Sequence, residues 1–156
     1  MTAVTSPTVH ASAVLVGARA ILIRGPSGAG KSRLALDLIT AGAAGGLRFS
    51  RLVGDDRVHL ESAGGRLLVR PAATLAGLIE DRGRGTLRLP YEPSAVVGLV
   101  VDLGAADAER LPERRQIELD GVTLPRLAVA AGVSALSGLL ALLTLAGAGL
   151  DPELRF

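Results

Sequence analysis

The chain has no cysteine and no tryptophan, and its 156 residues include only one tyrosine and two phenylalanines. Without cysteine it can form neither disulfides nor thiolate metal sites, and two histidines leave a structural zinc site without its usual ligands. Three aromatic residues are too few for a base-stacking surface that binds single-stranded nucleic acid. We therefore expect neither structural zinc nor a nucleic-acid partner.

The chain also has little excess charge of either sign. The 17 basic and 15 acidic residues give a net charge of +2, so the pI near 9.9 reflects balanced charges and not a dominant basic face. The N-terminal segment does not combine basic residues with an apolar stretch in the manner of a secretory signal. We expect a cytoplasmic protein with a single domain over residues 1–156, a length that suits one compact core.

One long segment, Leu127–Leu150, carries no charge and is long enough to cross a bilayer. Its many glycines, alanines and hydroxyl residues weaken that interpretation, and its leucines follow helical spacing. We expect no membrane span but a C-terminal helix, buried in this protein or packed against another subunit. The apolar stripe of that helix would comprise Leu136, Leu139, Leu140 and Leu143.

Lysine is nearly absent as well, because every basic residue except Lys31 is an arginine. This lysine completes the pattern GxxxxGK[ST] of a phosphate-binding P-loop, in which a compact ammonium reaches between phosphates where a planar guanidinium would fit differently. The alternative is a glycine-rich turn before an ordinary helix. The motif comprises Gly25, Pro26, Ser27, Gly28, Ala29, Gly30, Lys31 and Ser32.

The flanks of the motif follow the order strand, loop, helix. Two short apolar runs, Val14–Val16 and Ala20–Ile23, predict strands, and the apolar positions from Leu34 to Ile39 predict a helix that ends in a left-handed cap at Gly42. Glycines let the loop backbone approach phosphate closely, and the helix N-terminus favours anions. Lys31 would contact the β- and γ-phosphates and Ser32 would bind Mg²⁺.

A P-loop enzyme also needs an acidic residue near the phosphates. Asp55 and Asp56 follow a short apolar run after the predicted helix, in an order suited to a βαβ unit, and adjacent carboxylates on a strand point to opposite sides. The alternative is a surface turn. Further along, Arg57–Leu60 and Arg66–Arg70 predict a hairpin, and Ala95–Asp102 predicts a buried central strand.

A second polar cluster lies at residues 77–85, where charges and glycines follow an apolar stretch. From its composition, Glu80 is a candidate second metal ligand, and Arg82 or Arg84 would stabilise charge on a transferred phosphoryl group. The alternative is a solvated turn.

Together these segments resemble the catalytic domain of the HPr kinase/phosphorylase family, bacterial kinases that phosphorylate a serine of the phosphocarrier protein HPr. The stretch from Gly25 to Ile39 is similar to the family's GxSGxGKSxxALxLI, residues 52–58 to its LVADDxV, and residues 78–85 to its signature IEVRGLG. His10 stands where the family carries a catalytic histidine. Arg110 resembles a catalytic arginine in a DRL segment.

The resemblance implies a single P-loop α/β kinase domain related to phosphoenolpyruvate carboxykinase, using ATP and Mg²⁺. Asp56, preferred over Asp55, would be the base that accepts the serine proton; Arg82 and Arg110 would hold phosphate or substrate, and Ser32 and Glu80 would bind the metal. The resemblance further implies an HPr-like carrier as partner, a homo-oligomer that is commonly hexameric, and in some members reversal by phosphorolysis.

The chain departs from the family in three ways. First, the longer members carry an additional N-terminal domain, whereas this chain resembles the short form that consists of the catalytic domain. The PxxPGRN segment linked to the phosphorylase direction is not recognisable near Leu124–Ala128, and Asp81, Arg84 and Thr86 replace apolar residues of the signature. The phosphorylase direction thus stays open. The alternative functions are a nucleotide-binding regulatory module and a small P-loop metabolite kinase or NTPase.

Overall fold

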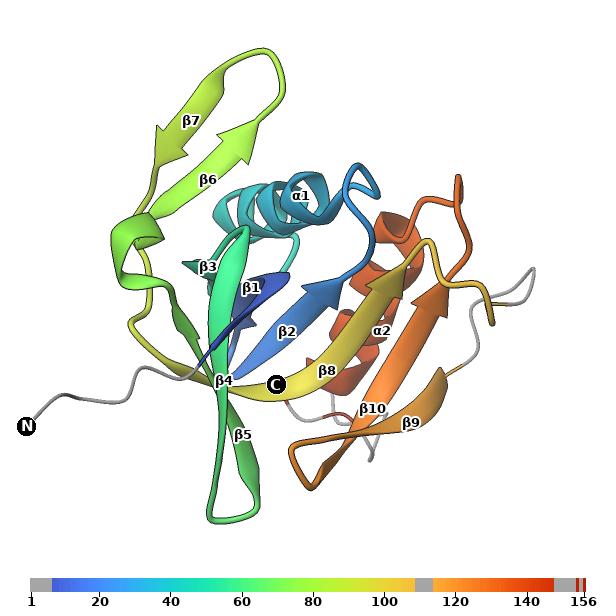
Figure 1. Cartoon of the computed structure of the whole chain (residues 1–156). Helices are drawn as coiled ribbons and strands as arrows, with labels where there is room; N and C mark the ends of the chain where they lie inside the picture. Colours follow the sequence, from blue (N-terminus) through green and yellow to red (C-terminus); the bar gives the residue numbers. More distant parts are fainter. Residues whose placement is uncertain (1–6, 109–113, 148–153, 155) are drawn as a thin grey trace, which may run out of the picture.

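A computed structural model describes residues 7–108, 114–147, 154 and 156 (Figure 1). Most of the regular secondary structure is strand, and the helices make the fold mixed α/β, in agreement with the expected class. The elements in chain order are β1 Thr8–Val16, β2 Arg19–Arg24, α1 Lys31–Ala43, β3 Ser50–Gly54, β4 Arg57–Ala63, β5 Arg66–Pro71, the 3₁₀ helix η1 Ala73–Leu75, β6 Leu78–Asp81, β7 Gly85–Arg88, β8 Ala95–Leu103, β9 Arg114–Leu119, β10 Val122–Val129 and α2 Leu136–Gly147.

The main sheet has eight strands in the order β2-β1-β4-β5-β8-β10-β9, with β3 paired to β1. Strand β2 also pairs with β8 in parallel, so the strands from β2 through β1, β4 and β5 to β8 form a closed circuit. Both β2 and β3 run antiparallel to β1. They are therefore parallel to each other across β1, and the expected β-α-β unit is present with one strand inserted between its two strands.

Side chains on opposite faces of the strands enter two different cores, because successive residues of a strand alternate in direction. In β2, Ile21 and Ile23 pack in the core that contains α1 and α2, whereas Ala20 and Leu22 pack in the core between β2, β8 and the β4–β5 hairpin. Strand β8 contributes to both cores and has strand neighbours on both sides. The prediction of a buried central strand is thus confirmed.

Helix α1 follows the P-loop as predicted but continues past Gly42. Its buried residues Leu34, Ala35 and Leu38 form the expected apolar face, and the left-handed glycine after the helix is Gly45, with φ 81°. A Cβ at Gly42 would overlap the side chain of Ser50. The predicted cap at Gly42 was therefore wrong, since this glycine allows close packing of the helix against β3.

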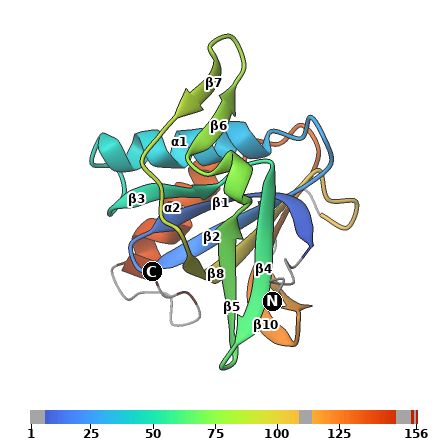
Figure 2. The same ribbon diagram turned by 60° about the vertical axis from the view of Figure 1, so that its left-hand side comes forward.

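Two hairpins lie between β3 and β8 in the chain. Strands β4 and β5 pair antiparallel around Gly64 and Gly65, whose φ values of 59° and 77° suit a tight two-residue turn, as the sequence predicted. Strands β6 and β7 form a separate two-stranded sheet. In both views this second hairpin projects from the body beside α1 (Figures 1 and 2). The polar cluster at residues 77–85 is thus a strand pair and its turn.

The segment Leu127–Leu150 is not one helix. Its first three residues end strand β10, which pairs with β8, and α2 begins only at Leu136. The predicted stripe is present, with Leu139 and Leu143 buried and the other two leucines partly buried in the core. None of the helices in the described part of the chain has the length and apolar character needed to cross a membrane.

Candidate functional site

The loop after β2 has the backbone conformation that its glycines allow. Gly28 and Gly30 have φ values of 82° and 97°, which side chains with a Cβ rarely adopt. Helix α1 begins at Lys31 with no side-chain cap at Gly30. The first N–H groups of a helix have no partner within it, so this end offers donors and positive dipole charge to an anion.

Lys31 is buried, with 6% of its surface exposed, and its Nζ folds back onto the loop. It donates to the carbonyl oxygens of Gly25 at 2.9 Å and Pro26 at 3.1 Å. Burial lowers the pKa of Lys31, and the nearby carboxylates of Asp55 and Asp56 partly oppose that shift. The ammonium is thus held beside the loop in a position to meet negative charge.

Asp55 and Asp56 follow β3 in a bend, and their side chains point in different directions. Asp55 is only 4% exposed and accepts hydrogen bonds from Ser32 Oγ at 2.9 Å to both carboxylate oxygens, from Ser12 Oγ at 2.6 Å and from the backbone N–H of Glu80 at 3.2 Å. This carboxylate therefore joins β1, α1 and the β6–β7 hairpin at one point.

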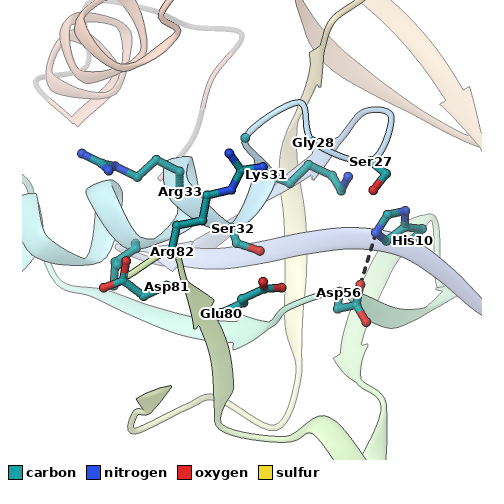
Figure 3. A pocket seen from close by; sticks show the side chains of 12 residues that line it. His10, Ser27, Gly28, Lys31, Ser32, Arg33, Asp56, Glu80, Asp81 and Arg82 are labelled. Atoms are coloured by element: carbon teal, nitrogen blue, oxygen red, sulfur yellow. Dashed lines mark ion pairs between the residues drawn. The ribbon is translucent and has the colours of Figure 1, made fainter. Parts of the chain in front are cut away.

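Asp56 instead faces the pocket opening. Its Oδ1 lies 3.2 Å from Nε2 of His10, and the two side chains are 63% and 38% exposed (Figure 3). The backbone of Asp56 has φ 68°, a left-handed conformation that is uncommon outside glycine and recurs at functional sites. The divergence of the two carboxylates was predicted, although a bend produces it and not the alternation of a strand.

The β6–β7 hairpin supplies the remaining polar groups. Glu80 and Arg82 both line the pocket, and Arg82 extends toward the P-loop while Glu80 lies below Ser32 (Figure 3). Asp81 forms an ion pair with Arg84 at 2.5 Å across the turn. Two of the residues that depart from the family signature therefore pair with each other.

These elements enclose one pocket of about 430 Å³. Of the predicted site residues, Asp55 lies behind the lining, Gly25, Pro26 and Ala29 belong to the loop outside it, and Arg110 falls outside the described residues. Arg84, the alternative to Arg82, pairs with Asp81 and does not line the pocket. The remaining predicted residues converge. The lining comprises His10, Ser27, Gly28, Gly30, Lys31, Ser32, Arg33, Leu36, Asp56, Glu80, Asp81 and Arg82.

Oxygen ligands suited to Mg²⁺ occur in this pocket, namely the Ser32 hydroxyl and the Glu80 carboxylate, with Asp55 hydrogen-bonded to Ser32. Within the described ranges no group of three or more His, Cys, Asp or Glu side chains is arranged to hold a metal by itself. This donor set fits an ion that is bound partly by the phosphates of a nucleotide, as Mg²⁺ usually is.

Sequence reasoning missed an ionic network beside the P-loop. Asp102 on β8 pairs with Arg24, the last residue of β2, and with Arg126 on β10, which also pairs with Asp107. Burial acts to raise the pKa of Asp102, but hydrogen bonds from both arginines outweigh it and the pKa is lowered. The one available signal was the charge of Asp102 and Arg24 at the ends of apolar strands.

Ser12 was also missed. It is a buried hydroxyl within the apolar strand β1, two residues after His10, and it contacts Asp55. A polar residue on the same strand face as a candidate catalytic histidine was the signal that would have found it.

Comparison with known proteins identifies the family of this chain. The family model described as HPr Serine kinase C-terminal domain matches residues 2–129. The HPr kinase/phosphorylase of Streptococcus thermophilus is 35% identical over 135 residues, covering 78% of this chain and 41% of that protein, and that of Clostridium tetani is 37% identical over 90 residues, covering 53% and 27%. The chain thus spans about two-fifths of the length of the Streptococcus relative.

A solved structure shares the fold. The Hpr(Ser) kinase/phosphatase from Coxiella burnetii superposes with a TM-score of 0.71 at 24% identity, covering 88% of this chain and 93% of that one. The family match extends over β1, the P-loop, the acidic pair, the β6–β7 hairpin and β8 to the end of β10. The chain therefore belongs to the family of HPr serine kinase C-terminal domains.

Proposed function

We propose that this protein is an ATP-dependent protein serine kinase whose acceptor is HPr or an HPr-like phosphocarrier. The observation that carries the proposal is the convergence, in one pocket, of the P-loop residues Lys31 and Ser32 with the His10–Asp56 pair. A phosphate-binding loop next to an exposed carboxylate provides both halves of phosphoryl transfer to a hydroxyl.

The loop residues fit a nucleoside triphosphate. The uncapped start of α1 and the ammonium of Lys31 would bind the phosphates, with Gly25 to Ser32 wrapping around them. Ser32 and Glu80 would hold Mg²⁺, which neutralises phosphate charge when bound. Arg82, and Arg110 from outside the described residues, would contact the transferred phosphoryl group or the substrate.

Asp56 is the proposed base. As the acceptor serine oxygen forms its bond to the γ-phosphorus, its proton passes to the Asp56 carboxylate, and the bond from the γ-phosphorus to the β–γ bridging oxygen breaks to release ADP. His10, at 3.2 Å, orients the Asp56 carboxylate. Asp55 is less suited to this role because it is buried and already accepts hydrogen bonds from Ser12 and Ser32.

The identity of the acceptor rests on the relatives, which are named HPr kinase/phosphorylase. A protein acceptor also suits the exposed position of Asp56 at the pocket opening. The proposal covers the kinase direction. Attack of inorganic phosphate on the phosphoserine, which restores the serine and forms pyrophosphate, is a separate reaction that is measured by incubating the phosphorylated carrier with phosphate.

Further parts of the proposal come from the family resemblance. These are a relation to the phosphoenolpyruvate carboxykinase fold, a cytoplasmic location, a single catalytic domain over residues 1–156 and a hexameric assembly. Light scattering of the purified chain measures the assembly directly, and a monomer at working concentration would contradict it.

The test is incubation of the purified chain with γ-labelled ATP, Mg²⁺ and an HPr-like carrier, followed by mass spectrometry of the carrier. We expect label on one carrier serine, lost in Lys31→Ala and retained in Arg66→Ala, an exposed position on the β4–β5 hairpin. Nucleotide binding without transfer would favour a regulatory module. Transfer to a small metabolite in place of the carrier would favour a metabolite kinase.

A further inference from the structure

Strand β1 directs two polar side chains toward the acidic pair. His10 and Ser12 are two residues apart and therefore lie on the same face of the strand. His10 contacts Asp56 at 3.2 Å, and Ser12 Oγ donates to Asp55 Oδ1 at 2.6 Å. One strand thus contacts both candidate carboxylates of the site.

Ser12 has no exposed surface, and the next residue on its own face of the strand, Val14, is buried in the apolar core that contains α1 and α2. A hydroxyl in such a position is unfavourable unless it forms a hydrogen bond, and an alanine would pack there at no polar cost. The bond that it forms is to a carboxylate, which is stronger than a bond between neutral groups. Ser12 does not line the pocket, so any effect on the site passes through Asp55.

Asp55 in turn is bonded to Ser32, the proposed ligand of Mg²⁺. The Ser32 hydroxyl donates a hydrogen bond to the Asp55 carboxylate, so the lone pairs of Oγ are available to a cation. The direction of those lone pairs depends on where the Asp55 carboxylate is held. Ser12 and the backbone N–H of Glu80 hold it from two other elements, β1 and β6.

We propose that Ser12 is a positioning residue for the magnesium–nucleotide site, acting through Asp55 on Ser32; this inference rests on the proposed function. Hydrogen bonds to the groups around metal ligands orient those ligands, and their loss typically lowers metal affinity by about 10- to 100-fold. Removal of the Ser12 hydroxyl would therefore weaken the response to Mg²⁺ while leaving the phosphate contacts of the P-loop in place.

The test compares Ser12→Ala with the unchanged protein by calorimetric titration of a non-hydrolysable ATP analogue, with and without Mg²⁺. We expect equal affinity without metal and an increase of about tenfold in the Mg²⁺ concentration that half-maximally strengthens binding. Ser50→Ala is the matched control, because Ser50 bonds to carbonyl oxygens of α1 remote from the pocket and its loss should change neither value.

Equal Mg²⁺ dependence in Ser12→Ala and the unchanged protein would overturn the inference, as would an equal loss of affinity with and without metal. A protein that binds no nucleotide even when unchanged would instead contradict the proposed function. Two further variants distinguish the loss of the hydrogen bond from a general disturbance of the fold. Ser12→Cys keeps the approximate size of serine with a weak donor and should behave as Ser12→Ala does. In an Asp55→Ala background, Ser12→Ala should cause no further loss, since interacting residues are not additive.

Discussion

Arg24 and Asp102 are direct neighbours on the parallel strands β2 and β8, and their side chains meet in a two-point ion pair. Arg24 Nε lies 2.7 Å from Oδ1 of Asp102, and Nη2 lies 2.7 Å from Oδ2. Because Arg24 immediately precedes Gly25, this pair holds the strand end from which the P-loop departs. Arg126 contacts the same carboxylate at 2.6 Å.

Asp102→Asn is expected to destabilise the fold by about 1–3 kcal/mol, since it leaves Arg24 and Arg126 without their shared carboxylate in a partly buried position. Urea unfolding at pH 7 measures the change. Asp37→Asn is the control, because Asp37 pairs with Arg33 on the surface of helix α1. An Asp102→Asn variant as stable as that control would contradict the structural role of the pair.

The same pair predicts a pH dependence. The pKa of Asp102 is lower in the folded protein than in the unfolded chain, so its contribution is complete above about pH 4, the ordinary pKa of an aspartate, and disappears as pH falls through the lower folded value. The stability difference between the protein and Asp102→Asn should therefore shrink below about pH 4. A difference that stays constant down to pH 2 would contradict this.

Lys31→Arg should weaken nucleotide binding by about 10- to 100-fold, the loss of a hydrogen bond to a charged group. The buried ammonium fits between the carbonyl oxygens of Gly25 and Pro26, and a planar guanidinium does not match that space. Calorimetric titration with ATP and Mg²⁺ measures the effect. Binding of Lys31→Arg at full affinity would show that the site needs only a positive charge.

Nucleotide affinity should also weaken as pH rises, and it should do so at a lower pH than it would with a lysine of ordinary pKa. Burial lowers the pKa of Lys31, so the ammonium that phosphate needs is lost below the usual value of about 10.4. Binding measured from pH 7 to 10 should weaken as pH rises. Affinity that is constant across this range would indicate that Lys31 keeps its proton there.

Asp56→Asn should reduce transfer to the carrier by about 10²- to 10⁴-fold while nucleotide binding remains, since it removes a general base. Asparagine tolerates the left-handed backbone of Asp56, so the fold should not change. Asp120→Asn makes the same substitution at φ 48° in the β9–β10 turn and should leave transfer unchanged. Equal rates in the two variants would exclude Asp56 as the base.

Gly42→Ala should destabilise the protein although alanine is the better helix former, because its Cβ would overlap Ser50. Gly138→Ala in α2 is the matched control: no described atom beyond its own helix and chain neighbours lies within 4 Å, and the substitution should stabilise by up to about 1 kcal/mol. Thermal unfolding of both variants compares the signs. A stabilising Gly42→Ala would contradict the close packing of α1 on β3.

Much of the site could be predicted because its signals are local. The P-loop needs glycines, Lys31 and Ser32 within eight positions, and the turn at Gly64–Gly65 needs two residues with positive φ. Each depends on neighbours in the chain, so the residue types are sufficient. The resemblance to a family added Glu80, Arg82 and His10, which composition alone left open.

Predictions that depended on distant packing were less accurate. An uncharged run such as Leu127–Leu150 suits a buried strand and a buried helix equally, and only the pairing of β10 with β8 makes its first residues a strand. Gly42 likewise looked like a helix cap, although its contact with Ser50 could not be seen from helical spacing.

The sequence by itself thus determined the glycine-rich loop between β2 and α1 and predicted that this loop binds phosphate, because both follow from contiguous residues. Only the tertiary structure decided which distant side chains pair in and around the pocket: Ser12 with Asp55, His10 with Asp56, and Arg24 with Asp102. The physical reason is that these pairs form across strands, where the register of the sheet, and not separation along the chain, sets the distance between side chains.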